Sequence, residues 1–503
     1  MNRIELFIIA FVITAASSAG AGDRVRTEKN SIGFSVQTIS LPEDEPLTLG
    51  GTACRIYGGD VWYYGISAYG AVAGERGGFF TGGVCGGARV PIFDGWTAYA
   101  ECFFGGGGGG AAPQGGGMML RPSCMFFKKA GRVSVGAGYS YVWFPNGEIS
   151  SGSVCGGLQV DFDRAYTEGR TFGQGQTDLD LKPVRWRYGP GICAYTVSGE
   201  NRTLSGEEYD DTVICAGFGA DRFVSQRLCF TGRIYGAFSG EADGYAKLLC
   251  GPVYSSPRFA QDRVRAEAGL LAGAAGGGGV DTGGGLLVQP EIGLVIHLSD
   301  SYSVYVREGY LHAFSGDFDC LTSSLGICRS FGGFSFSDNR REQVSYTLFP
   351  WRTGISVKTC FPGSGIRKKS GDPYERTISL IGITADRLLT PASYLCAAAY
   401  GAFEGKAGGY AEGFMGMGLV LFENGTVSAE SDLRIGASGG GGVDIGGGMI
   451  LEAGLSIEYR FDESYACMLR AGWLSAPGGT YEAPFAEAGI SRSFGQLGNG
   501  QRI

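Results

Sequence analysis

The sequence predicts an all-β protein whose antiparallel strands close into up-and-down barrels. Three observations lead to this prediction: apolar residues occupy every second position of many segments, turn signals separate these segments, and one set of landmarks recurs three times in 503 residues. Glycine makes up 91 of the 503 residues, about 18 per cent, against roughly 7 per cent in average proteins. Because no G-X-Y period accompanies it, this excess indicates a folded chain and not collagen.

The N-terminus has the pattern of a secretory signal peptide. Arg3 precedes an apolar run from Leu6 to Ala16, and small residues follow up to Ala21. We therefore expect residues 1–21 to be a cleaved signal peptide and the mature chain to be exported. No later segment has the 18 or so consecutive apolar residues that a membrane-spanning helix needs.

A tyrosine-glycine motif marks the three repeats. It begins at Tyr69-Gly70, at Tyr235-Gly236 and at Tyr400-Gly401, so the steps are 235 − 69 = 166 and 400 − 235 = 165 residues. Three segments that end in an aromatic residue close the repeats at Phe162, Phe331 and Phe494. The predicted units are repeat 1 at 31–162, a linker at 163–186, repeat 2 at 187–331, a linker at 332–345, repeat 3 at 346–494 and a tail at 495–503.

Each repeat also carries a double glycine block. The blocks are 105–110 with 115–117, 276–279 with 283–285, and 439–442 with 446–448. Successive glycine N–H groups can form an anion-binding nest, but we expect flexible loops or closely packed backbone here. No βαβ pattern surrounds the blocks, so their GxGxxG-like spacing does not indicate a dinucleotide site.

Within a repeat the hydrophobic period is two. In the third repeat, apolar residues alternate from Met449 to Phe461, with Glu452 and Glu458 among the residues between them. The second repeat predicts eight strands, at about 191–198, 211–222, 227–239, 244–254, 263–272, 286–298, 302–314 and 318–331. Eight strands of this length suit a small closed barrel.

The composition of the two strand faces indicates a transmembrane barrel. The bulky residues lie on one face, and glycine, serine, alanine and scattered charges lie on the other. An eight-stranded barrel has a narrow interior, so the bulky face is expected to point outward. Aromatic pairs such as Tyr302 and Tyr310 are eight residues apart, about 26 Å along a strand, which matches an apolar band about 25 Å tall.

On these features the chain resembles the small eight-stranded outer-membrane β-barrel proteins of Gram-negative bacteria, in three tandem copies. The resemblance implies an outer-membrane location, with outer-membrane lipids and the barrel-insertion machinery as partners, the latter reading the closing aromatics Phe162, Phe331 and Phe494. One residue departs from the pattern: Glu308 falls on the apolar face, which predicts either a facing barrel or a local bulge. A single barrel of about 24 strands is the alternative to three barrels.

Charged residues on the inward face form the candidate functional set. They are expected to pair and to fill the lumen as a polar network; they are Glu291, His297, Arg307, Glu452, Glu458, Arg460 and Arg470. Asp60, Asp221 and Asp386 recur near the end of the second strand, and we expect them to stabilise turns. The pattern predicts no catalytic, cofactor-binding or metal-binding residues, and no cofactor.

The sequence therefore favours a non-enzymatic outer-membrane barrel protein with a structural or surface-interaction role through its loops. Alternatives are a channel or porin, a membrane-embedded lipid hydrolase using His312, and a soluble secreted ligand-binding barrel. The net charge of −8 is thinly spread, so nucleic acid is not an expected partner. The fourteen cysteines lie mostly in apolar runs without CxxC spacing, which favours buried free thiols over disulfides.

Overall fold

The computed structural model describes residues 25–197, 203, 212–240, 242–336, 343–363, 365–374 and 376–499. The predicted signal peptide lies outside these residues. The described residues form 25 β-strands and one short 3₁₀ helix, Pro42–Asp44, and all named strand pairs are antiparallel. The predicted all-β antiparallel class is confirmed. No helix in this part of the chain has the length and apolar character needed to cross a membrane.

Hydrogen-bond pairing closes the first eight strands into a ring, barrel 1, because β1 pairs with both β2 and β8. Closure leaves no exposed sheet edge. The strands are β1 (Arg26–Ser40), β2 (Pro46–Tyr57), β3 (Trp62–Ala73), β4 (Phe80–Phe93), β5 (Trp96–Gly108), β6 (Met119–Ala130), β7 (Val133–Trp143) and β8 (Ser150–Glu168).

The second ring, barrel 2, closes between β10 and β17. All eight strands predicted for this repeat are present, although β10, β14 and β17 are longer than predicted. The strands are β10 (Leu181–Val197), β11 (Val213–Phe223), β12 (Leu228–Ser239), β13 (Ala246–Ser255), β14 (Val264–Gly276), β15 (Leu286–His297), β16 (Tyr302–Ala313) and β17 (Asp319–Phe336).

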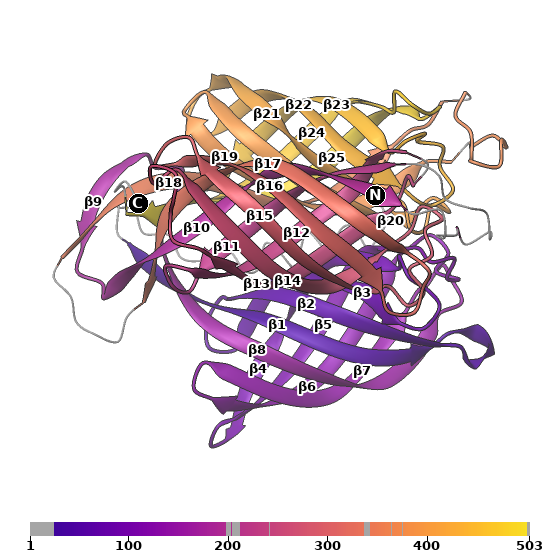
Figure 1. Cartoon of the computed structure of the whole chain (residues 1–503), viewed down its shortest axis with the longest axis horizontal. Helices are drawn as coiled ribbons and strands as arrows, with labels where there is room; N and C mark the ends of the chain where they lie inside the picture. The colour runs from indigo at the N-terminus through magenta and orange to yellow at the C-terminus, as the bar shows by residue number, and fades with distance from the viewer. Residues whose placement is uncertain are drawn as a thin grey trace.

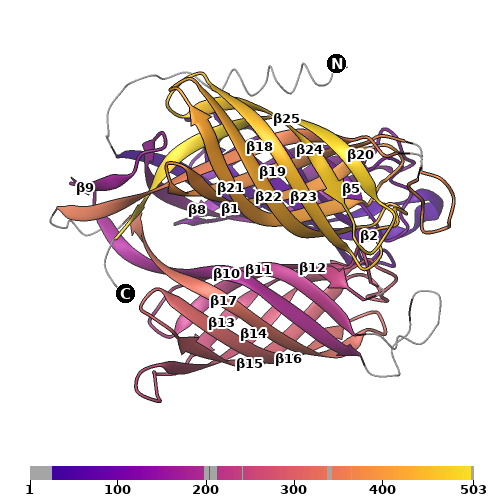
Figure 2. The same ribbon diagram turned by 90° about the horizontal axis from the view of Figure 1, so that it is seen from above.

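The third ring, barrel 3, closes between β18 and β25. Its strands are β18 (Val344–Cys360), β19 (Ile378–Thr390), β20 (Ser393–Glu404), β21 (Ala411–Glu423), β22 (Val427–Gly439), β23 (Met449–Arg460), β24 (Tyr465–Ser475) and β25 (Glu482–Gly498). Figures 1 and 2 show the three barrels side by side.

A few pairs between barrels join the rings into one continuous 25-stranded sheet. The remaining strand, β9 (Gly173–Thr177), pairs with the start of β18, and the end of β8 pairs with the end of β25. These contacts lie at the end of the molecule that carries β9 and the C-terminus, at the left of Figures 1 and 2. We call it the linker end; the opposite end, with the glycine blocks, is the loop end.

The strands run past the predicted limits of the repeats at this linker end. β8 extends to Glu168, β17 to Phe336 and β25 to Gly498, while β10 begins at Leu181 and β18 at Val344. Most of the first predicted linker, 163–186, is therefore strand. Most of the extended backbone pairs within its own barrel, as Leu181 does with Phe336, and the end of β8 also pairs with β25. A small apolar cluster around Leu181, Leu348 and Leu497 covers the extensions.

The two faces of the strands are as predicted: large apolar side chains point outward and polar ones inward. On β15, Ile292 is 67% and Leu294 46% exposed, whereas the network residue Glu291, which directly precedes Ile292, is 6% exposed. One expectation about the interior is wrong, because the lumen also holds aromatic rings. Tyr195, Tyr245 and Phe318, for example, pack with ring centroids 5.8–6.1 Å apart.

Glycines on neighbouring strands make room for these rings. A Cβ on Gly51, Gly217 or Gly382 would lie within 3.0 Å of the ring of an inward tyrosine, the first residue of the repeated motif in each barrel. These are Tyr69, Tyr235 and Tyr400. The inward glycines thus leave the space that the aromatic rings occupy. This explains how a narrow barrel can contain aromatic side chains.

Glu308 points outward, as its position in the alternation predicts. Its pairing with Ser323 on β17 and Ile292 on β15 is regular, so no bulge is present at this position. The carboxylate accepts a hydrogen bond of 2.6 Å from the Ser323 hydroxyl. The expected bulge is therefore wrong. Among the described strands, β16 packs mainly against β15 and β17 of its own barrel, and Glu308 is exposed.

Replacing Glu308 with leucine is expected to stabilise the chain in a lipid bilayer. A carboxylate on the lipid-facing side costs up to about 2 kcal/mol at mid-depth, and loss of the Ser323 hydrogen bond offsets part of the gain. We expect the free energy of unfolding to rise by about 1 kcal/mol, measured by urea unfolding in liposomes. A decrease would show that Glu308 meets a polar partner in the membrane.

All fourteen cysteines lie in the described part of the chain, and each is a free thiol. Nine of them, including Cys193, Cys215 and Cys360, are buried within the barrels, where they pack as small apolar side chains.

Candidate functional site

The three barrels contact one another through equivalent strands. The third strand of each barrel packs against the fifth strand of the next: β3 against β14, β12 against β22, and β20 against β5. The same interface between a third and a fifth strand occurs three times, and the third occurrence joins barrel 3 back to barrel 1. A heterologous interface that repeats in this way forms a closed ring. The chain is therefore built as a covalent trimer of similar barrels with approximate threefold symmetry.

The repeated tyrosine-glycine motif lies on the third strand at this interface. Its tyrosine points into the lumen, where the Tyr400 hydroxyl donates to Glu487 at 2.8 Å and the Tyr69 hydroxyl accepts from Arg121 at 3.2 Å. Its glycine faces the next barrel. A Cβ on Gly70 or Gly236 would lie 3.4 or 3.2 Å from the Cβ of an alanine on the fifth strand there.

The glycine blocks pack against the same motif, backbone to backbone. A Cβ placed on Gly78, Gly244 or Gly409 would come within 3.0 Å of backbone atoms of a block in the neighbouring barrel. On its other side each block touches the loop of its own barrel, as Gly277 touches Gly244. These contacts form a continuous circuit around the threefold axis, which we call the glycine hub: Gly78, Gly277, Gly244, Gly440, Gly409 and Gly109.

Hydrogen bonds cross between barrels near the glycine hub. Gly77 N–H donates to the carbonyl of Gly283 at 2.7 Å, and Gly409 N–H donates to that of Gly107 at 3.2 Å. Between barrels 2 and 3, Lys369 forms an ion pair with Asp243. Burial raises the pKa of Asp243, an effect that the Lys369 ammonium partly offsets. The glycine blocks are closely packed backbone at an interface, one of the two structures expected for them.

The closing aromatics lie between barrels at the linker end. The ring of Phe331 is 9% exposed and packs on Phe349 of barrel 3 at 4.9 Å, while the Phe494 ring is 6% exposed and lies 4.2 Å from the Arg164 guanidinium of barrel 1. Phe162 is half-buried. Two of the three residues are therefore covered by a neighbouring barrel.

At the linker end of barrel 3, one arginine holds three carboxylates. The Arg352 guanidinium lies 2.7 Å from each of Asp386, Glu430 and Glu458. Arg170, from the segment between β8 and β9, enters the same mouth and forms ion pairs with Glu430 at 3.8 Å and with Glu458. A residue of the first linker thus closes the lumen of the third barrel.

The network continues through barrel 3 toward the loop end. Lys358 is fully buried and pairs with Glu412 at 2.6 Å and with Glu452. Arg470 bonds to Glu452 at 2.8 Å and to Glu487 at 3.0 Å. Paired charges therefore fill the lumen from one end almost to the other, and unpaired charge there would be costly.

Barrel 2 repeats the arginine cluster with fewer charges. Arg187 pairs with Asp221 at 2.7 Å and with Glu267 at 2.8 Å. Arg307 lies 3.4 Å from Glu267 and 3.8 Å from Glu291. His297 lies at the linker-end mouth of this barrel, where its Nδ1 is 2.9 Å from the Ser303 hydroxyl.

Barrel 1 has a largely neutral lumen at the same level. Ser31 occupies the position of Arg187 and Arg352 in the strand register, and its hydroxyl lies 2.9 Å from the Tyr57 hydroxyl. Farther in, Arg55 pairs with Glu101 at 2.6 Å. The three barrels are alike in backbone but differ in the charge of their interiors.

The expected turn role of Asp221 and Asp386 is wrong, since both are buried lumen residues that pair with arginines on the first strand. The sequence-based set also omitted those arginines, Arg187 and Arg352, together with Lys358. The omitted residues occupy inward positions, as the predicted ones do. Applying the inward and outward alternation to every residue of β10 and β18 would have identified them. Arg460, which was predicted, lies at the linker-end rim of barrel 3, 3.8 Å from Glu458.

One contact in the structure is relevant to the alternative of a lipid hydrolase that uses His312. His312 Nδ1 lies 2.7 Å from an Asp319 oxygen on the outer face of barrel 2. Among the described residues no serine forms a hydrogen bond with this histidine, and the nearby Ser315 hydroxyl accepts one from the Gly284 amide at 2.9 Å.

Comparison with known protein families and with curated proteins found no match. Among solved structures, the chain is similar to a bacterial polysaccharide outer membrane secretin (7% identity, 94% of this chain and 99% of that chain, TM-score 0.21). It is also similar to a ferric enterobactin receptor from Pseudomonas aeruginosa (9%, 95% and 81%, TM-score 0.28) and to OccK5 from the same organism (9%, 95% and 99%, TM-score 0.21). Similarity this weak transfers no function to the chain, which its own structure defines as an antiparallel β-barrel protein.

Proposed function

We propose that the chain is an integral outer-membrane protein in which three eight-stranded barrels cross the bilayer as one covalent trimer. The main support for this proposal is that the closed barrels have apolar outer surfaces and charged interiors. A soluble barrel has the opposite arrangement, with its apolar face inward. Exposed aromatics at both strand ends support it, since Tyr302 is 46% and Tyr310 44% exposed. Outer-membrane lipids and the insertion machinery are the partners that this location requires.

Within that location, the filled interiors favour a non-enzymatic structural or surface role. Ion pairs and aromatic rings occupy the lumens, and the glycine hub fixes the loops that would face the medium. A rigid platform of three barrels presents its longer loops, such as the one that contains residues 365–374, at defined distances from one another. Binding through these loops is the activity that such an architecture suits.

Membrane fractionation with heat-modifiable gel migration tests the proposal. We expect the chain in the outer-membrane fraction, released by detergent only, with faster migration before boiling than after it because folded barrels resist SDS. Recovery from the periplasm without detergent would contradict the proposed location.

A gated channel is the second candidate, favoured by the continuous line of charged groups through barrel 3. Such a line conducts only if ion pairs exchange partners and admit water. Planar-bilayer recordings decide between the two functions. A silent bilayer supports the structural role, and steady cation or anion conductance that disappears in an Arg170→Trp variant would support the channel.

A further inference from the structure

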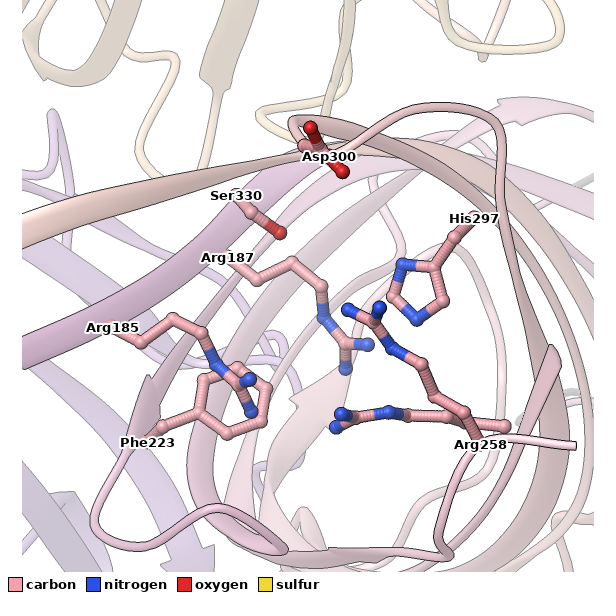
Figure 3. A pocket seen from close by; sticks show the side chains of 8 residues that line it. Arg185, Arg187, Phe223, Arg258, His297, Asp300 and Ser330 are labelled. Atoms are coloured by element: carbon pink, nitrogen blue, oxygen red, sulfur yellow. The ribbon is translucent and has the colours of Figure 1, made fainter. Parts of the chain in front are cut away.

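The linker-end mouth of barrel 2 contains a cluster of basic side chains. Figure 3 shows Arg185, Arg187, Arg258 and His297 around one small space, and Arg265 also lines it. The cavity has a volume of about 20 Å³, room for one or two water-sized atoms. We call this group the arginine mouth; its remaining lining residues are Phe223, Asp300 and Ser330.

The carboxylates deeper in the barrel do not neutralise the arginine mouth. Asp221 and Glu267 already pair with Arg187, and Glu267 also pairs with Arg307. Among the described residues, Arg185, Arg258 and Arg265 form no ion pair, and Asp300 is the one acidic residue in the lining. Three guanidinium groups therefore converge with at most one exposed carboxylate to balance them.

Buried nitrogen atoms in the same place have no hydrogen-bond partner. Arg185 Nε, Arg265 Nε and His297 Nε2 are all shielded from solvent without a hydrogen-bond partner. The Phe223 ring holds Arg185 in place, 3.6 Å from the guanidinium carbon. Unsatisfied buried donors cost free energy, and arginines stacked in a fixed orientation are suited to bind oxyanions with two hydrogen bonds each.

The equivalent mouth of barrel 3 shows how such an imbalance is removed. There the excess is acidic, with Glu430 and Glu458 at the opening, and Arg170 from the first linker supplies the counter-charge. No described segment does the same for barrel 2, whose excess is basic. The complement that the described residues do not supply is an anion.

We propose that the arginine mouth binds a phosphate group, with its terminal oxygens accepting hydrogen bonds from Arg185, Arg258 and Arg265. The small cavity admits one or two of the phosphate oxygens and leaves the remainder of a phosphomonoester outside the barrel. The shared chemistry is the phosphate dianion, whether it is free or part of a lipid headgroup. Binding neutralises the mouth as Arg170 neutralises that of barrel 3.

The test uses the full chain in detergent micelles, titrated calorimetrically with inorganic phosphate and, separately, with monomeric short-chain phosphatidic acid at constant ionic strength. The variants are Arg258→Gln and Arg258→Gln/Arg265→Gln. The matched control is Arg263→Gln, which removes the same charge from the exposed turn that carries Arg258 but lies outside the cavity lining. Heat-modifiable migration verifies that each variant is folded.

We expect at least one probe to bind, with affinity about tenfold lower in the double variant, roughly the loss of a charged hydrogen bond, and unchanged in the control. Binding of inorganic phosphate identifies a free anion site, and binding of phosphatidic acid alone identifies a lipid headgroup site. If neither probe binds, the proposal is overturned. Equal loss in the control would also overturn it, because it would indicate general charge attraction.

Discussion

A Gly244→Ala variant is expected to unfold far more easily than the wild-type chain, through failure of the glycine hub. Gly244 has a φ of +86°, and a Cβ there would lie 2.7 Å from the backbone nitrogen of Gly440 in barrel 3. Backbone atoms cannot rotate away as a side chain can, so the two barrels must separate. We expect a loss of about 1–3 kcal/mol from overpacking, in addition to about 1–2 kcal/mol for the left-handed conformation.

Gly425→Ala is the control for this prediction. Gly425 also has a φ of +86° but lies in a turn where an added Cβ meets nothing within 4 Å. The decrease in the free energy of unfolding of Gly425→Ala therefore measures only the cost of placing alanine in the left-handed conformation. Thermal unfolding in detergent measures both variants, and dyes on the exposed turns at Asp262 and Asn424 follow the separation of barrels 2 and 3. Equal destabilisation of the two variants would show that the hub contributes nothing to docking.

The strands were predictable because alternation is a local property of the sequence. On β23, residues from Met449 to Arg460 point outward and inward as their order alone requires. The same parity places Glu452 and Glu458 in the lumen. It also identifies Glu308 as an outward carboxylate, although its actual partner, Ser323, depends on the strand register.

Contacts between repeats could not be predicted in this way. The glycine blocks indicate close backbone packing, but their sequence does not say which backbone approaches them, and Gly244 contacts residues almost 200 positions away. The sequence around Arg170 likewise places this residue only in a linker. Arg170 reaches the lumen of barrel 3 because the three barrels close into a ring. Tertiary arrangement, not local pattern, determines both.

Removing the Arg352 guanidinium is expected to cause the second large effect. An Arg352→Met variant keeps much of the side-chain volume but leaves Asp386, Glu430 and Glu458 close together in a buried site. Losing one partner of a buried ion pair typically costs about 3–5 kcal/mol, because the remaining charge is desolvated and unpaired. Arg170 still reaches Glu430 and Glu458, so it compensates in part and Asp386 remains without a partner.

Urea unfolding in detergent measures this loss, and Lys129→Met provides the comparison. Lys129 pairs with Asp161 at 3.1 Å, but its side chain is 56% exposed, and exposed ion pairs contribute about 0–1 kcal/mol. The difference between the variants therefore isolates the effect of burial. If Arg352→Met cost no more than Lys129→Met, water would have to reach the three carboxylates. That result would favour the channel over a sealed barrel, since the same water would open a path for ions.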